Sequence, residues 1–293
     1  MSTKLEYESF KWGDYSIVWV DSRDIDGALE FYREKGLDGI GVSPHHGYKN
    51  KDLAFLDNVK DLSGLVIVYG YDFDISPVER CQGLRFLVIS ENKQGLDLSQ
   101  LPALCDLSLD WNKRLILPRA EDSPQLSRLH LWGFLAGNLE SLSAYPQLAE
   151  LHLIQATVQT LDGIGELGRL TDLELAYCSR LRQLRAIAAL KSLRTLDIEN
   201  CKRIQDWSVL QHCAALTLLR LEDCGDIEGI SFIKDMPSLQ EFRFVTTNIV
   251  DGDLSPCLGL KTVAFLPNKK HYSHTLDQIE AALRAKQEQE GTV

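Results

Sequence analysis

The residues best suited to chemistry are two histidines, His130 and His152, which stand among many carboxylates. Imidazole nitrogens and carboxylate oxygens are common zinc ligands, so His130, His152 and Glu174 would offer suitable donors. The carboxylates would serve acid–base catalysis only inside an enclosed pocket that shifts their pKa values. We expect neither role, because the pattern described below arranges these side chains in open, straight columns. The sequence thus predicts no metal, no cofactor and no enzymatic activity.

Two further motifs have the spacing of chemical sites. Residues 163–168 match the G-x-G-x-x-G dinucleotide fingerprint, which has meaning only between a strand and a helix. Three of the cysteines, Cys178, Cys201 and Cys224, are evenly spaced. A repeat register accounts for both features, since Leu167 falls in a core column and the thiols form a ladder of small apolar groups. We therefore expect reduced, structural cysteines and no bound nucleotide.

A repeated pattern, Leu-x-x-Leu-x-Leu, organises most of the chain. The first leucine of each clear unit lies at position 62, 84, 104, 126, 148, 170, 193, 216, 239 or 260. Each Leu-x-Leu pair predicts a short strand whose alternate side chains point inward. One unit cannot bury its own apolar face, so neighbouring units must stack and place a parallel sheet along one side.

These units resemble the leucine-rich repeat family, specifically the short bacterial, internalin-like type. The resemblance covers about residues 37–270, in ten clear units and a degenerate one at Leu37. The family's Asn/Cys position holds Asn92, Asn112, Cys178, Cys201, Cys224 and Asn268. The chain departs from that position at Phe134, Ala156 and Thr247, where we expect irregular loops. The resemblance implies an α/β leucine-rich repeat solenoid with a parallel, concave sheet.

The repeats divide the chain into three parts. We assign residues 1–36 to an N-terminal cap of strand plus helix, residues 37–270 to the repeats, and residues 271–293 to a C-terminal capping helix and tail. A solenoid needs such caps because its terminal units otherwise expose their core to water.

Both caps carry local sequence signals. Residues 16–20 predict a strand, and residues 24–35 predict an amphipathic helix that ends at Gly36. Near the other end, Thr275 and Gln278 have the spacing of a capping box, in which each side chain bonds the backbone N–H of the other residue. That motif predicts the start of the last helix.

Function in such solenoids usually lies on the concave sheet, where the outward positions of each strand are displayed. Between residues 86 and 245, carboxylates outnumber arginines nine to three at these positions. The acidic columns could be only a solvated face. Large aromatic residues share the surface, however, and aromatics beside charge are typical of protein-binding hot spots. We predict a partner-binding surface made of Phe86, Asp110, Trp111, His130, Trp132, Glu150, His152, Asp172, Glu174, Asp197, Glu199, Arg220 and Glu222.

Charge and composition limit the classes of partner that this chain can bind. The 293 residues include 31 Lys+Arg and 42 Asp+Glu, for a formal net charge of −11. Phosphate contacts need clustered basic residues, so we expect no nucleic acid and no anionic membrane as a ligand. There is no apolar stretch long enough for a transmembrane helix, and the first residues lack a signal-peptide pattern. We expect a cytoplasmic monomer that binds a basic protein.

A narrower resemblance concerns three segments, one before the clear repeats, one in the last unit and one after it. Residues 43–49, 248–254 and 269–272 resemble a group of bacterial cytoplasmic leucine-rich repeat proteins, some of which accompany toxins as immunity proteins. The resemblance implies that this chain neutralises a cognate toxin by covering its active-site surface. The alternative is a housekeeping scaffold or regulatory subunit that recruits an enzyme without inhibiting it.

Overall fold

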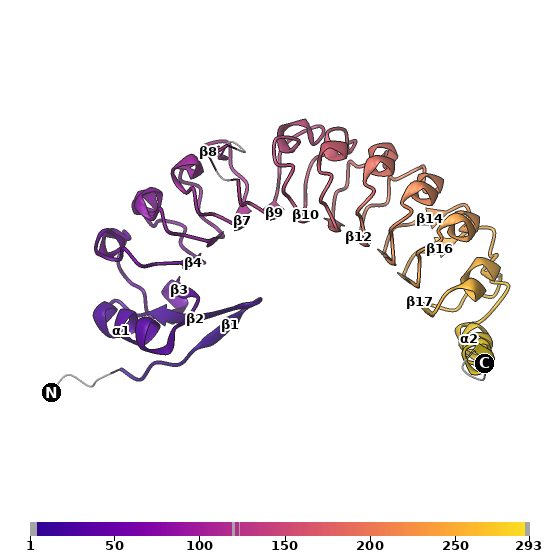
Figure 1. Cartoon of the computed structure of the whole chain (residues 1–293), viewed down its shortest axis with the longest axis horizontal. Coiled ribbons are helices and arrows are strands. Elements are labelled where there is room, and N and C mark those ends of the chain that lie inside the picture. Colours follow the sequence, from indigo (N-terminus) through magenta and orange to yellow (C-terminus); the bar gives the residue numbers. More distant parts are fainter. Residues whose placement is uncertain (1–4, 119–120, 123, 291–293) are drawn as a thin grey trace. The chain divides into compact units, whose positions relative to one another are not determined.

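The computed structural model describes residues 5–118, 121–122 and 124–290. They form two compact units, divided after Trp132. In each unit the strands lie side by side along one face, and turns of 3-10 helix lie along the opposite face (Figure 1). The predicted parallel sheet is confirmed in both units.

The main sheet of the first unit has the strand order β1-β2-β3-β4-β5-β7-β9. Its elements are β1 Phe10–Trp12, β2 Tyr15–Val20, α1 Ile25–Lys35, β3 Gly39–Val42, β4 Gly64–Ile67, β5 Phe86–Ile89, β6 Leu96–Asp97, β7 Asp106–Asp110, β8 Leu115–Ile116 and β9 Arg128–Trp132. Strands from β2 onward pair in parallel, whereas β1 pairs antiparallel to β2. Strands β6 and β8 form a separate short pair on the return segments.

The second unit continues the same repeat, with the strand order β10-β11-β12-β13-β15-β17. Its elements are β10 Glu150–Ile154, β11 Asp172–Ala176, β12 Thr195–Glu199, β13 Leu218–Glu222, β14 Asp226–Ile227, β15 Glu241–Val245, β16 Asn248–Ile249, β17 Thr262–Leu266 and α2 Leu276–Glu290. The return segments carry 3-10 turns at Pro44–His46, Ala54–Asn58, Ser76–Arg80 and Leu98–Gln100 in the first unit, and at Glu140–Leu142, Ile164–Glu166, Arg185–Ala189, Ser208–His212, Ser231–Asp235 and Ser255–Gly259 in the second. The G-x-G-x-x-G segment lies on one of these turns rather than between a strand and a long helix, and Leu167 is buried.

A left-handed residue ends most strands of the second unit. Gln155, Tyr177 and Asn200 follow β10, β11 and β12 with φ values of 55°, 55° and 50°. This backbone costs a non-glycine residue about 1 kcal/mol. Each of the three N–H groups donates to the last carbonyl of the next strand at 2.8 Å, which offsets the cost. The corner turns the chain away from the sheet and holds these side chains at its edge.

The core lies between the sheet and the 3-10 turns. Leu170, Leu173 and Leu175 of one repeat are each at most 1% exposed, and a fully buried leucine stabilises the fold by about 2 kcal/mol. Beside them, the thiol of Cys201 donates to the carbonyl of Leu175 in the preceding repeat at 3.3 Å, and Cys178 and Cys224 make the equivalent bonds to Leu153 and Ile198. The predicted ladder of buried thiols is confirmed.

Thr247 continues the cysteine ladder. Its hydroxyl donates to the carbonyl of Leu221 at 3.3 Å and accepts from the N–H of Cys224 at 3.1 Å. The expectation of an irregular loop at this position is therefore wrong, because a threonine hydroxyl replaces the bonds of the usual Asn or Cys side chain. Phe134 and Ala156 are likewise buried in the core.

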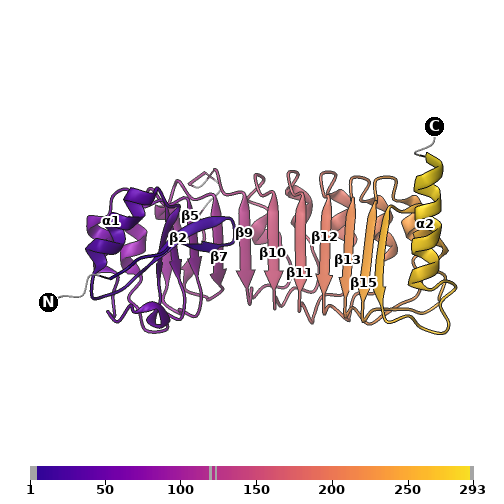
Figure 2. The ribbon, with the colours of Figure 1, turned by 90° about the horizontal axis from the view of Figure 1, so that it is seen from below.

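The helix predicted in the N-terminal cap is confirmed as α1. The Asp24 side chain accepts from the N–H of Gly27 at 3.1 Å, and Gly36 ends the helix with a left-handed backbone. The hairpin of β1 and β2 was not expected. Figure 2 shows it lying across the strands of the first unit, and Tyr15 at the start of β2 contacts Phe86 of β5.

The C-terminal helix α2 lies against the end of the second unit, with Ile279 and Leu283 buried. Its predicted capping box is confirmed. The N–H of Thr275 donates to Oε1 of Gln278 at 2.8 Å, and the N–H of Gln278 donates to Oγ1 of Thr275 at 3.3 Å. Two backbone donors at the helix start are thereby satisfied.

Candidate functional site

Strands β10 to β13 place the predicted carboxylates in register on the outward side of the sheet. Residue pairing sets Glu150 beside Asp172, Glu174 beside Asp197, and Glu199 beside Glu222. Neighbouring strands in a sheet lie about 4.8 Å apart, so these groups form a closely spaced cluster. We call the six residues Glu150, Asp172, Glu174, Asp197, Glu199 and Glu222 the acidic face. Glu222 is exposed and the other five are half-buried.

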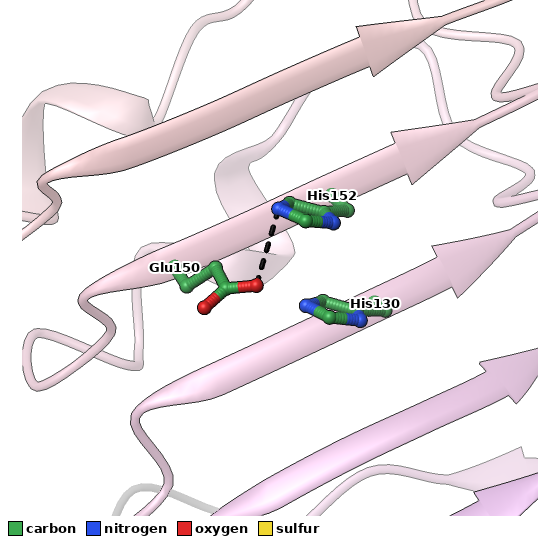
Figure 3. Close-up of side chains that lie close together, drawn as sticks. All are labelled: His130, Glu150 and His152. Atoms are coloured by element: carbon green, nitrogen blue, oxygen red, sulfur yellow. Dashed lines mark ion pairs between the residues drawn. The ribbon is translucent and has the colours of Figure 1, made fainter. Parts of the chain in front are cut away.

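His152 stands between two of these carboxylates. Its Nε2 lies 3.2 Å from Oε1 of Glu150 (Figure 3), and its Nδ1 lies 3.3 Å from Oε2 of Glu174. A neutral imidazole carries only one N–H, so both contacts are favourable only when the ring is protonated. Only the protonated form of His152 offsets part of the negative charge at the β10 end of the acidic face.

Arg220 offsets a second part of the charge. Its Nη1 lies 3.3 Å from Oδ2 of Asp197, and both side chains are partly exposed. Burial raises the pKa of Asp197, against the lowering effect of Arg220. Exposed pairs of this kind contribute little to stability.

Glu199 and Glu222 form the open end of the acidic face. Tyr177 stands beside them with 46% of its surface exposed. A hydrogen bond to Glu199, followed by the negative charges of Glu199, Glu222 and Asp223, raises the pKa of Tyr177. The sequence places Tyr177 at the rim of this surface, but our predicted site did not include it.

One predicted residue does not lie on an open surface: Phe86 is 2% exposed. The ring of Tyr15 stacks on it with a centroid distance of 3.7 Å and an interplanar angle of 9°. The expectation that Phe86 is displayed to a partner is therefore wrong, because the β1–β2 hairpin covers the sheet there. The outward positions of β4 and β5 indicate this cover, since Val66 and Val88 are apolar where an open face would be polar.

Ion pairs hold the hairpin in place. The Tyr15 hydroxyl donates to Oδ2 of Asp106 at 2.8 Å, and Arg128 lies 2.9 Å from the same oxygen. Arg128 also pairs with Asp14 in the hairpin at 2.8 Å and donates to the Tyr15 hydroxyl. Asp106 and Arg128 occupy outward positions of β7 and β9. Both side chains bind residues of the hairpin instead of facing open solvent.

The other predicted residues of the first unit remain accessible. Trp132 is 48% exposed at the end of β9, and Trp111 and Asp110 are half-buried at the end of β7. His130 is half-buried on β9 (Figure 3). The structure therefore places the predicted aromatic anchors and the acidic face on different units.

Solved structures that are similar to this chain include internalins. No family model and no curated protein match the sequence. An internalin (inlF) from Listeria monocytogenes superposes with a TM-score of 0.51 at 16% identity, covering 84% of this chain. The fold is a leucine-rich repeat solenoid. The match spans 65% of that internalin's length. An internalin C2 from the same organism is 21% identical, covers 72% of this chain and 83% of its own, and has a TM-score of 0.46.

Among residues 5–118, 121–122 and 124–290, neither helix is long and apolar enough to cross a bilayer. The expected absence of metals, nucleotides and catalysis stays a prediction.

Proposed function

We propose that this chain binds a basic protein partner through the acidic face. The observation that supports it most is the register of carboxylates on four neighbouring strands. Like charges on adjacent strands destabilise a sheet slightly, so their accumulation on the face that such solenoids use for binding favours a function over chance. A negative field on this surface also speeds the encounter with a positively charged partner.

The sharper proposal is that the partner is a bacterial toxin and that this chain is its immunity protein. A toxin that cleaves nucleic acid carries a basic active-site surface, because it must bind phosphates. The acidic face would cover that surface and pair its lysines and arginines, as an anionic substrate does. In the proposed complex, Arg220 and His152 vary the charge that the acidic face presents to the toxin. Contacts from the first unit are added by Asp110, Trp111, His130 and Trp132. The resemblance of the three flanking segments supports the toxin as partner.

Affinity capture with two baits tests the proposal. The first bait is the full chain; the second carries Glu174→Lys, Asp197→Lys and Glu199→Lys. We expect one dominant basic partner on the first bait and none on the second. Expressed alone, that partner should be toxic to cells, and co-expression of the full chain should restore growth.

A third bait controls for net charge. Glu166, Glu228 and Asp235 are exposed residues on return segments of the same unit. Reversing these three to lysine makes the same change in charge, and we expect this bait to keep the partner. Equal loss on both reversed baits would mean that net charge, not the acidic face, recruits the partner. Capture of a harmless enzyme whose activity persists in the complex would favour a scaffold over an immunity protein.

A further inference from the structure

A second surface of the first unit combines exposed aromatic rings with carboxylates. Tyr69 and Tyr71 follow β4 and are 44% and 62% exposed. Trp111 and Trp132 follow or end β7 and β9, and Trp132 is 48% exposed. We call these four residues the aromatic rim. Exposure of large aromatic side chains to water is unfavourable in free energy. Their clustering along one edge of one unit therefore indicates a surface that binds a partner.

Contacts show that the rim is continuous and includes two carboxylates. The backbone N–H of Trp111 donates to the carbonyl of Trp132 at 2.7 Å. At the ends of the preceding strands, the N–H of Glu91 donates to Oδ2 of Asp110 at 2.7 Å, and Glu91 is near enough to Tyr71 to raise the pKa of its hydroxyl. Glu91 and Asp110 therefore lie between the tyrosines and the tryptophans of the rim.

The electrostatic environment of the rim favours a cation. The hydrogen bond to Glu91 is the largest cause that raises the pKa of Tyr71, and the negative charges of Glu91 and Asp110 act in the same direction. Oε2 of Glu91 is shielded from water and has no hydrogen-bond donor among the described residues.

We propose that the aromatic rim binds an arginine side chain of a partner protein. A guanidinium stacks on an aromatic face and at the same time donates to a carboxylate, which matches the alternation of rings and acids along this edge. An ammonium group is more strongly hydrated and fits the rings less well, so lysine should bind more weakly. The proposal rests on the proposed function as a protein-binding chain and names the group that its first unit takes.

Titration of the full chain with short blocked peptides tests this. The probe is acetyl-Gly-Arg-Gly-Arg-Gly-amide, with lysine and citrulline versions as controls, and calorimetry reads the Kd. Citrulline keeps the shape of arginine but lacks its charge. We expect the citrulline peptide to bind about tenfold more weakly than the arginine peptide, and the lysine peptide to fall between them.

Two variants locate the binding. Tyr71→Ser with Trp132→Ser removes two exposed rings and should weaken arginine-peptide binding about tenfold. Tyr177→Ser, an exposed ring of the second unit, should leave it within about twofold. Unchanged binding by the double variant, or equal affinity for citrulline, overturns the proposal. Loss of binding on reversing Glu174, Asp197 and Glu199 instead assigns the peptide to the acidic face, which refutes the rim while the proposed function stands.

Discussion

Removal of the Tyr15 side chain should loosen the turn end of the N-terminal hairpin, while strand β2 stays paired with β3. Tyr15 joins that end of the hairpin to strands β5 and β7: its ring covers Phe86, and its hydroxyl bonds Asp106. The guanidinium of Arg128 lies over the same ring, 5.3 Å from its centroid. In Tyr15→Ala, Phe86 becomes exposed and Asp106 loses one of its partners.

The magnitude follows from these contacts. The stacked rings cover about 100 Å² of apolar surface, worth about 2.5 kcal/mol at about 25 cal/mol per Å². The ring pair adds about 0.5–1 kcal/mol beyond its area. The hydrogen bond to the buried carboxylate of Asp106 adds about 1 kcal/mol. Tyr15→Phe removes this bond and the one from Arg128 but keeps the ring contacts. We therefore expect a loss of about 4–4.5 kcal/mol for alanine and about 1 kcal/mol for phenylalanine.

Hydrogen exchange and thermal unfolding together check this prediction. In Tyr15→Ala, the amides of β1 should exchange far faster than in the wild type, while those of β10 to β13 should not change. The unfolding midpoint of the first unit should fall, with Tyr15→Phe between the two. If Tyr15→Ala keeps wild-type protection in β1, then the hairpin is held by its backbone pairing with β2, and our account of the stack is wrong.

Three further outcomes follow from the fold. A Cβ on Gly64 would lie 1.8 Å from a ring atom of Phe86, so Gly64→Ala should destabilise the first unit by about 1–3 kcal/mol in chemical denaturation, whereas Gly137→Ala meets nothing within 4 Å and should cost little. Thr275→Ala breaks the capping box and should cost about 1 kcal/mol, seen as faster exchange at the start of α2. Burial raises the pKa of Cys257 from 9.0 to about 12, so the folded state holds this proton more tightly than the unfolded chain. Stability should therefore be full below pH 9 and fall as the pH rises toward 12; in Cys257→Ala the fall should be shallower, and an equal slope would contradict the assignment.

The repeat could be read from the sequence because its signal is local and redundant. Every unit repeats the same inward leucines, so the strands β4 to β17 of the main sheet follow from spacing alone. The capping box at Thr275 and the helix before Gly36 depend on residues three or four positions apart, which again is local information. The outward columns of the acidic face follow from the two-residue period of a strand, so the register of Glu199 beside Glu222 was predictable.

Only the tertiary structure decided which of those outward columns are free. Phe86 has the same repeat position as Asp172, yet the hairpin covers the first and leaves the second open to solvent. That difference depends on the contact of Tyr15 with Phe86, Asp106 and Arg128, which are separated from it by 71 to 113 positions in the chain. Contacts at such separation carry no periodic signal. The packing of one particular ring against another, and the pairing of nearby charges, determine which part of a regular sheet remains available to a partner.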